Sequence, residues 1–174
     1  MLPRHQIGLN SEQDELRGFS RTIAEIEWLL LGLVLVYLVA GGPADDGRLA
    51  IHTALFFFAA FILGLHYVQF YKEEKRSKLL FENTVIIGFI TWVVWYTGQS
   101  HSPLLNLYLF PIIASALIFG KVPTIAKLVA IIVFLMYFAL EQGSKSLFSP
   151  PYWAEILAVS APMILVAYIT TMLS

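Results

Sequence analysis

Six apolar stretches, each close to the length that crosses a membrane, follow one another along this chain of 174 residues. A hydrocarbon core about 30 Å thick needs roughly 20 helical residues to cross it. Six crossings therefore use most of the sequence and leave no room for a soluble catalytic domain. The sequence predicts an all-α integral membrane protein with six transmembrane helices, which acts within the bilayer or at its two surfaces.

Glycine and proline mark several ends of the predicted helices. Gly41, Gly42 and Pro43 end the first apolar stretch, and Gly120 ends the fourth. Because most connections are only a few residues long, neighbouring helices must pack antiparallel. The first helix is short for a core of this thickness, so we expect it to continue back toward Phe19. The six predicted helices cover about 26–40, 49–70, 79–96, 104–119, 122–140 and 153–173.

Composition agrees with this class of protein. Apolar residues make up 58% of the chain and charged residues 13%, which is typical of a protein with many membrane spans. The chain has no cysteine, which excludes disulfides and thiolate metal sites. Its net charge is −1, and we expect membrane lipids and not nucleic acid among its partners.

Lysine and arginine predict the orientation of the chain. Cytoplasmic loops of membrane proteins carry an excess of these residues. Arg48 and Lys145 fall on one side of the predicted bundle, and the other side carries the rest. The sequence therefore predicts that both termini are cytoplasmic. The residues on the predicted cytoplasmic side are Arg4, Arg17, Arg21, Lys72, Lys75, Arg76, Lys78, Lys121 and Lys127.

Residues 1–25 form a polar segment before the membrane domain of residues 26–174. Ser11 is a candidate cap for a helix whose first turn is acidic. An apolar stripe runs from this helix into the first span, at Leu16, Phe19, Ile23, Ile26 and Leu30. We expect an amphipathic cytoplasmic helix that lies on the inner leaflet. A dimer seam, or a docking strip for a cytoplasmic domain, is the alternative.

Ionisable groups within membrane spans cost free energy, so each is a candidate for function. His66 lies near the inner end of the second predicted helix, and Glu82 and Asn83 lie near the inner end of the third. A pair between His66 and Glu82 would either lock the two helices together or act as a protonation-sensitive switch. Lys127 is expected to anchor the orientation of its helix by snorkelling. We predict no metal site.

The hairpin between the third and fourth predicted helices, residues 92–111, is the candidate ligand site. Trp92, Trp95 and Tyr96 predict an aromatic belt at the outer interface. Flat rings stack on tryptophan, and polar groups of the turn offer hydrogen bonds to a ligand, so the hairpin predicts a small pocket. An ordinary helical hairpin tip is the alternative. The candidate ligand-binding residues are Trp92, Trp95, Tyr96, Gly98, His101, Pro103 and Asn106.

This hairpin carries a resemblance to a known family. The run T-G-Q-S-H-S-P-L, followed by L-N-L-Y-L-F-P-I-I-A-S-A-L-I-F-G-K, resembles the third-to-fourth helix region of six-helix sensor domains. Such domains precede histidine kinase or diguanylate cyclase (GGDEF) output domains in bacterial signalling proteins. The opening D-E-L-R-G-F-S-R-T-I-A-E-I-E-W-L-L-L is similar to the start of a cyclase-linked domain.

The resemblance implies a sensory domain of the bacterial inner membrane that has no catalytic residues of its own. It implies a homodimer, and transmission through the last helix to a cytoplasmic output domain beyond this chain. Related sensor kinases bind quinone at a G-G-x-x-N-P-F loop. Gly98 and Pro103 match that loop, whereas Gln99, Ser102 and Leu104 depart from it. A quinone, a lipid or another amphiphile, or the state of the membrane, is thus the expected stimulus.

Two other classes of protein remain as alternatives. A small transporter would contain internal repeats and paired broken helices, which the sequence does not show. An intramembrane enzyme would need converging carboxylates, or a serine with a histidine at membrane depth. His66 and Glu82 alone are too few for such a catalytic site.

Overall fold

The chain is almost entirely helical in the computed structural model, which describes residues 4–42, 45–68, 76–141 and 150–173. No strand occurs within these ranges. Two short 3₁₀ helices, η1 (Gln99–His101) and η2 (Leu105–Tyr108), lie between the third and fourth α-helices. The α-helices are α1 (Arg4–Val39), α2 (Asp45–Val68), α3 (Arg76–Tyr96), α4 (Leu109–Phe119), α5 (Lys121–Glu141) and α6 (Pro150–Leu173).

The six apolar stretches of the sequence are all helical, and the largest difference from expectation is in α1. It begins at Arg4, before Ser11, and continues without a break to Val39. The segment expected to lie on the inner leaflet as an amphipathic helix is therefore part of one helix of 36 residues. At 1.5 Å per residue this helix is about 54 Å long, so it exceeds the thickness of a bilayer core.

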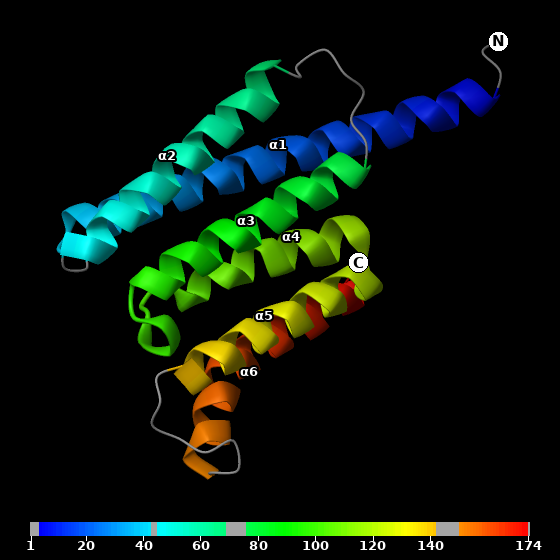
Figure 1. The fold of residues 1–174 in the computed structure, drawn as a ribbon. Coiled ribbons are helices and arrows are strands. Elements are labelled where there is room, and N and C mark those ends of the chain that lie inside the picture. The colour runs from blue at the N-terminus through cyan, green and yellow to red at the C-terminus, as the bar shows by residue number, and fades with distance from the viewer. Residues whose placement is uncertain (1–3, 43–44, 69–75, 142–149, 174) are drawn as a thin grey trace.

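The helices alternate in direction along the chain, and both termini lie toward the same end of the bundle (Figure 1). Helices α1, α2 and α3 contact one another, and α4, α5 and α6 form a second set of mutual contacts. Contacts between α3 and α4 join the two sets, with smaller ones from α1 to α4 and from α3 to α5. The α3–α4 hairpin is thus the centre of the bundle.

The buried face of α1 is a continuous stripe at spacings of three and four residues. Phe19 and Ile26, which the sequence placed on this stripe, are only partly buried at its edge. Two polar residues, Ser20 and Glu27, lie within the buried stripe itself. The buried residues are Leu16, Ser20, Ile23, Glu27, Leu30, Val34 and Leu38.

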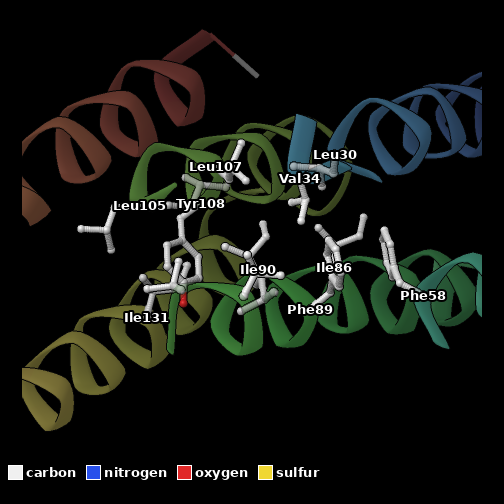
Figure 2. Packing of buried hydrophobic residues seen from close by; sticks show 14 of the residues in the cluster. Leu30, Val34, Phe58, Ile86, Phe89, Ile90, Leu105, Leu107, Tyr108 and Ile131 are labelled. Atoms are coloured by element: carbon white, nitrogen blue, oxygen red, sulfur yellow. The ribbon is translucent and has the colours of Figure 1, made fainter. Parts of the chain in front are cut away.

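Large apolar side chains fill the space between the helices. Figure 2 shows Leu30 and Val34 of α1 facing the same interior as Ile86 and Ile90 of α3. The rings of Phe58 in α2 and Phe89 in α3 stack with centroids 4.0 Å apart. Aromatic stacking of this kind adds about 0.5–1.5 kcal/mol beyond the burial of area. These contacts fix the positions of α2 and α3 relative to each other.

The α3–α4 connection enters the protein interior and is more than a surface turn. Gly98 adopts a φ of 117°, a left-handed conformation that strongly favours glycine. The hydroxyls of Thr97 and Ser102, both buried, hydrogen-bond across the turn. The Leu104 amide donates to Ser102 Oγ at 3.2 Å, so Ser102 supports the turn as a cap would. Irregular backbone in a membrane protein needs such internal partners.

Four helices of the described ranges are long and apolar enough to cross a membrane. They cover 13–39, 47–66, 76–96 and 121–138. Two shorter apolar helical segments, Leu105–Phe119 and Ile156–Met172, lie between and after them. Many large apolar side chains, such as Phe56, Phe57 and Val122, are exposed on the surface of the bundle. Such a surface fits a membrane protein, because lipid covers it.

Candidate functional site

A groove of about 590 Å³ lies between α3 and α5. Its lining is mostly apolar and aromatic, and Lys127 is the only charged side chain in it. A concave, largely apolar site with few polar groups is typical of ligand pockets. We refer to this feature as the α3/α5 groove. It is lined by Thr84, Ile87, Gly88, Thr91, Trp92, Trp95, Tyr96, Lys127, Ala130 and Phe134.

Three of the candidate ligand-binding residues lie together in this groove. Trp92 and Tyr96 are exposed and their ring centroids are 6.2 Å apart, while Trp95 is half-buried beside them. The ring of Trp95 also meets those of Tyr137 and Phe138 in α5, at 5.9 Å and 5.3 Å. Trp92, Trp95 and Tyr96 thus line one end of the groove, and Tyr137 and Phe138 contact Trp95 there without lining the groove themselves.

The other four candidates lie in the hairpin and do not line the groove. Gly98 and His101 are exposed at the two sides of η1, which packs against α5. Pro103 is exposed just after it. Asn106 is exposed in η2. The hollow therefore lies along the helices α3 and α5 themselves. The sequence located the pocket at the turn that follows α3.

Glycine and alanine widen the middle of the groove. A Cβ atom added at Gly88 would meet no other atom within 4 Å. Ala130 of α5 lines the same hollow and is exposed. Larger side chains at either position would occupy the space that these two residues leave open.

Lys127 is half-buried, and its ammonium nitrogen is buried and does not extend to the surface as a snorkelling anchor would. Its ammonium nitrogen has no hydrogen-bond acceptor among the residues that the structure describes. The nitrogen lies 4.8 Å from the centroid of the Phe119 ring, a cation–π contact with the end of α4. Such a contact compensates only part of the free energy that burial of an ammonium costs.

A second feature is a group of polar side chains between α1, α2 and α3, which we call the polar cluster: Glu27, His66, Lys78, Glu82 and Asn83. His66 Nε2 lies 2.9 Å from Glu27 Oε2. Lys78 Nζ lies 3.7 Å from Glu82 Oε1, and it also interacts electrostatically with Glu27. Glu27 and Glu82 are fully buried. The cluster thus combines two acids with two bases, which reduces the cost of each buried charge.

Glu27 is the member of this cluster that sequence reasoning missed. The expected partner of His66 was Glu82, whereas its hydrogen bond goes to α1. One signal was present, because Glu27 repeats the three- and four-residue spacing of the buried stripe between Ile23 and Leu30. An acidic residue at such a position in an apolar run needs a buried partner.

Two further polar contacts connect α3 to the hairpin and α4. Asn83 Nδ2 donates to the Pro111 carbonyl at 3.1 Å. The hydroxyls of Thr91 and Tyr108 hydrogen-bond at 2.8 Å, and Tyr108 is fully buried. The oxygen of Tyr108 points toward α3 in Figure 2. These bonds hold the wall of the groove that α3 provides.

Among the described residues no group of three or more His, Cys, Asp and Glu side chains is placed to hold a metal ion. Comparison of the chain with protein-family models, with curated proteins and with solved structures found no match.

Proposed function

We propose that this chain is a membrane sensory domain that binds an apolar or amphipathic ligand in the α3/α5 groove. The observation that carries the proposal is the groove itself, a hollow of about 590 Å³ with aromatic walls and one cation. A hollow of this kind, bounded by two membrane-length helices, is accessible to molecules dissolved in the bilayer. A quinone, a lipid or another amphiphile has the required shape and polarity.

The packing of α5 gives such a site a route to the last helix. One wall of the groove belongs to α5, and α5 packs along α6. A ligand that separates α3 from α5 must shift α5 against α6 or move both helices together. Shifts of one or two ångströms between packed helices are a common form of signal transmission.

The proposal includes the finer topology. All six apolar segments cross the membrane, both termini are cytoplasmic, and the groove opens within the bacterial inner membrane. The domain is a homodimer, has no catalytic activity of its own, and passes its signal from α6 to a cytoplasmic kinase or cyclase domain. The excess of lysine and arginine on one side and the resemblance of the hairpin support this part of the proposal.

The test measures ligand binding and helix movement in the same purified protein. Because the chain has no cysteine, spin labels can be placed at Ser77→Cys and Met172→Cys, both exposed positions near the same end of the bundle. We expect native mass spectrometry to find a bound amphiphile in a dimer. Removal of that amphiphile should change the distance between the labels by an ångström or more.

A matched pair of variants separates the groove from the rest of the surface. Gly88→Leu should fill the groove and abolish binding, because the added side chain enters open space. Gly64→Leu places the same side chain at an exposed position of α2 with equally open surroundings, and should bind as the parent does. Binding that survives Gly88→Leu, or a bound ligand that leaves the label distance unchanged, would contradict the sensory role.

A further inference from the structure

We infer that the ligand of the α3/α5 groove is a single-chain fatty carboxylate, whose head group pairs with Lys127 and whose tail runs toward Trp95. This inference rests on the proposed function and specifies the chemistry of its ligand. Three observations carry it: the buried ammonium of Lys127, the length of the groove, and the aromatic rings of Trp92, Trp95 and Tyr96 that line its far end.

The buried ammonium of Lys127 favours an anionic ligand. Its nitrogen is buried and lacks a hydrogen-bond acceptor in the part of the chain that the structure describes. Among the described residues, the contact of this charge is with the Phe119 ring, which accepts no conventional hydrogen bond. A buried charge without a counter-ion is costly, and an anionic head group would supply both charge and acceptors. A neutral ligand such as a quinone would leave this cost in place.

The groove has the dimensions of an extended chain. Helices α3 and α5 run in the same direction, and Trp95 of α3 meets Tyr137 of α5. Lys127 is the first residue of α5 in the lining, and on α3 the lining runs from Thr84 to Tyr96, a rise of about 18 Å along the helix. The walls between these two levels are apolar, with Gly88 and Ala130 widening the middle. A carboxylate at Lys127 therefore places an acyl chain along the whole hollow, with its end against the aromatic rings.

The groove favours a ligand with a single acyl chain and a single negative charge. It is bounded by only two helices, and its lining contains a single cation. A phospholipid would bring a second chain and a larger head group, for which the lining provides no further polar residues. In the proposed orientation the Lys127 end faces the cytoplasmic leaflet. A fatty acid of that leaflet can enter sideways with its carboxylate already at the correct depth.

Titration of the 174-residue chain in a non-ionic detergent, followed by native mass spectrometry, tests this inference. The probes are palmitate, its neutral ester methyl palmitate, decylubiquinone and dipalmitoylphosphatidylglycerol. We expect palmitate to bind with one molecule per chain. Methyl palmitate should bind about tenfold to a hundredfold more weakly, because it cannot form the charge-assisted hydrogen bond.

The variant Lys127→Met removes the charge and keeps a long, helix-forming side chain. We expect it to lose the preference for palmitate over the ester, while Lys127→Arg keeps that preference. Lys121→Met is the matched control, because Lys121 is an exposed lysine at the start of the same helix and does not line the groove. Helix content by circular dichroism confirms that each variant is folded.

Other binding results would contradict the assigned ligand, and one of them would also contradict the proposed function. Equal binding of palmitate and methyl palmitate, or an unchanged preference in Lys127→Met, overturns the assignment of the head group. Binding of decylubiquinone or the phospholipid in place of palmitate also overturns it; if Gly88→Leu abolishes that binding, the proposed ligand site stands. Failure of every probe to bind the parent protein would count against the inference and the proposed function together.

Discussion

Several buried polar residues of this protein form hydrogen bonds between one helix and the next. Glu27 meets His66 between α1 and α2, Asn83 meets the Pro111 carbonyl between α3 and α4, and Thr124 donates to Ser115 Oγ between α4 and α5. In an apolar interior each such bond also specifies which helices are neighbours, since a slip in register would leave its groups unpaired. The order of the helices around the bundle therefore depends on a few side chains.

The pair between His66 and Glu27 should stabilise the bundle. We expect His66→Ala to destabilise the protein by about 2 kcal/mol, because it deprives a buried carboxyl group of its hydrogen bond. The double variant Glu27→Leu/His66→Ala should lose less than the sum of the single variants, since an apolar replacement removes the uncompensated group. Thermal unfolding in detergent measures these effects.

His52 is the matched control for this prediction. It lies on the same helix, is exposed, and its Nδ1 hydrogen-bonds only to the Arg48 carbonyl of its own turn among the contacts described. His52→Ala should change stability by less than about 0.5 kcal/mol. Additive effects of the Glu27 and His66 substitutions would show that the two side chains are not coupled.

The hydroxyl of Thr91 has a role that the hydroxyl of Thr53 lacks. Both donate to a carbonyl of their own helix, but Thr91 also bonds the buried hydroxyl of Tyr108. We expect Thr91→Val to cost about 1–3 kcal/mol and Thr53→Val almost nothing. Thr91→Val/Tyr108→Phe should recover most of the loss. If the double variant remains as unstable as Thr91→Val, the lost stability comes from packing and not from the hydrogen bond.

At the level of elements, the helices could be predicted from the sequence because their signals are local. Apolar runs, together with glycine and proline at their ends, gave bounds within a few residues for α2, α3, α5 and α6. The stripe that runs into the first span was visible in the sequence, but the helix was expected to begin near Ser11 and to lie on the inner leaflet, whereas α1 begins at Arg4 and is continuous to Val39. Local signals do not report which helix faces which.

The candidate site was predictable only in part for the same reason. Trp92, Trp95 and Tyr96 are adjacent on one helix face, so the sequence could group them. The α5 residues that complete the groove, among them Lys127, are distant in sequence and carry no motif. Glu27, the partner of His66 on α1, lies 39 residues away along the chain. Only tertiary packing determines that these two residues meet.

A single glycine connects α4 to α5, and its conformation makes it hard to replace. Gly120 has φ 78° and ψ −164°, a region that side chains with a Cβ atom rarely enter. We expect Gly120→Ala to destabilise the protein by about 1–3 kcal/mol. Gly64→Ala, within the regular part of α2, should stabilise it by up to about 1 kcal/mol.

Thermal unfolding of both glycine variants in the same detergent makes the comparison. Destabilisation by Gly120→Ala together with stabilisation by Gly64→Ala would confirm that the constraint at Gly120 is one of backbone conformation. Neither position has atoms within 4 Å of an added Cβ, so steric contact cannot account for a difference between them. A neutral Gly120→Ala variant would contradict the strained connection.

At the level of the whole molecule, the two sets of three helices share the hairpin that joins α3 to α4. Four helices have membrane-spanning length and two are shorter, so composition alone does not assign the topology. The alternation of helix direction in Figure 1 places the α1–α2 turn and η1 at one end and the α4–α5 connection at the other. If all six helices cross, these ends face opposite sides of the membrane.

Cysteine labelling tests this topology without background, since the chain has no native cysteine. Ser77 at the start of α3 and Pro103 in the hairpin are both exposed. In intact cells a membrane-impermeant maleimide should label Pro103→Cys and leave Ser77→Cys unlabelled. After lysis both should react. Labelling of both positions in intact cells, or the reverse pattern, would contradict the proposed orientation.

Every threonine of the chain donates its hydroxyl hydrogen bond to the backbone carbonyl four residues earlier. At the exposed positions the threonine methyl group is consequently what faces the lipid. A hydropathy scale nevertheless counts each of these residues as polar. Evolution can then exchange threonine for valine on the outer faces with little effect, whereas the same exchange inside the bundle is constrained. These threonines are Thr22, Thr53, Thr84, Thr91, Thr97, Thr124, Thr170 and Thr171.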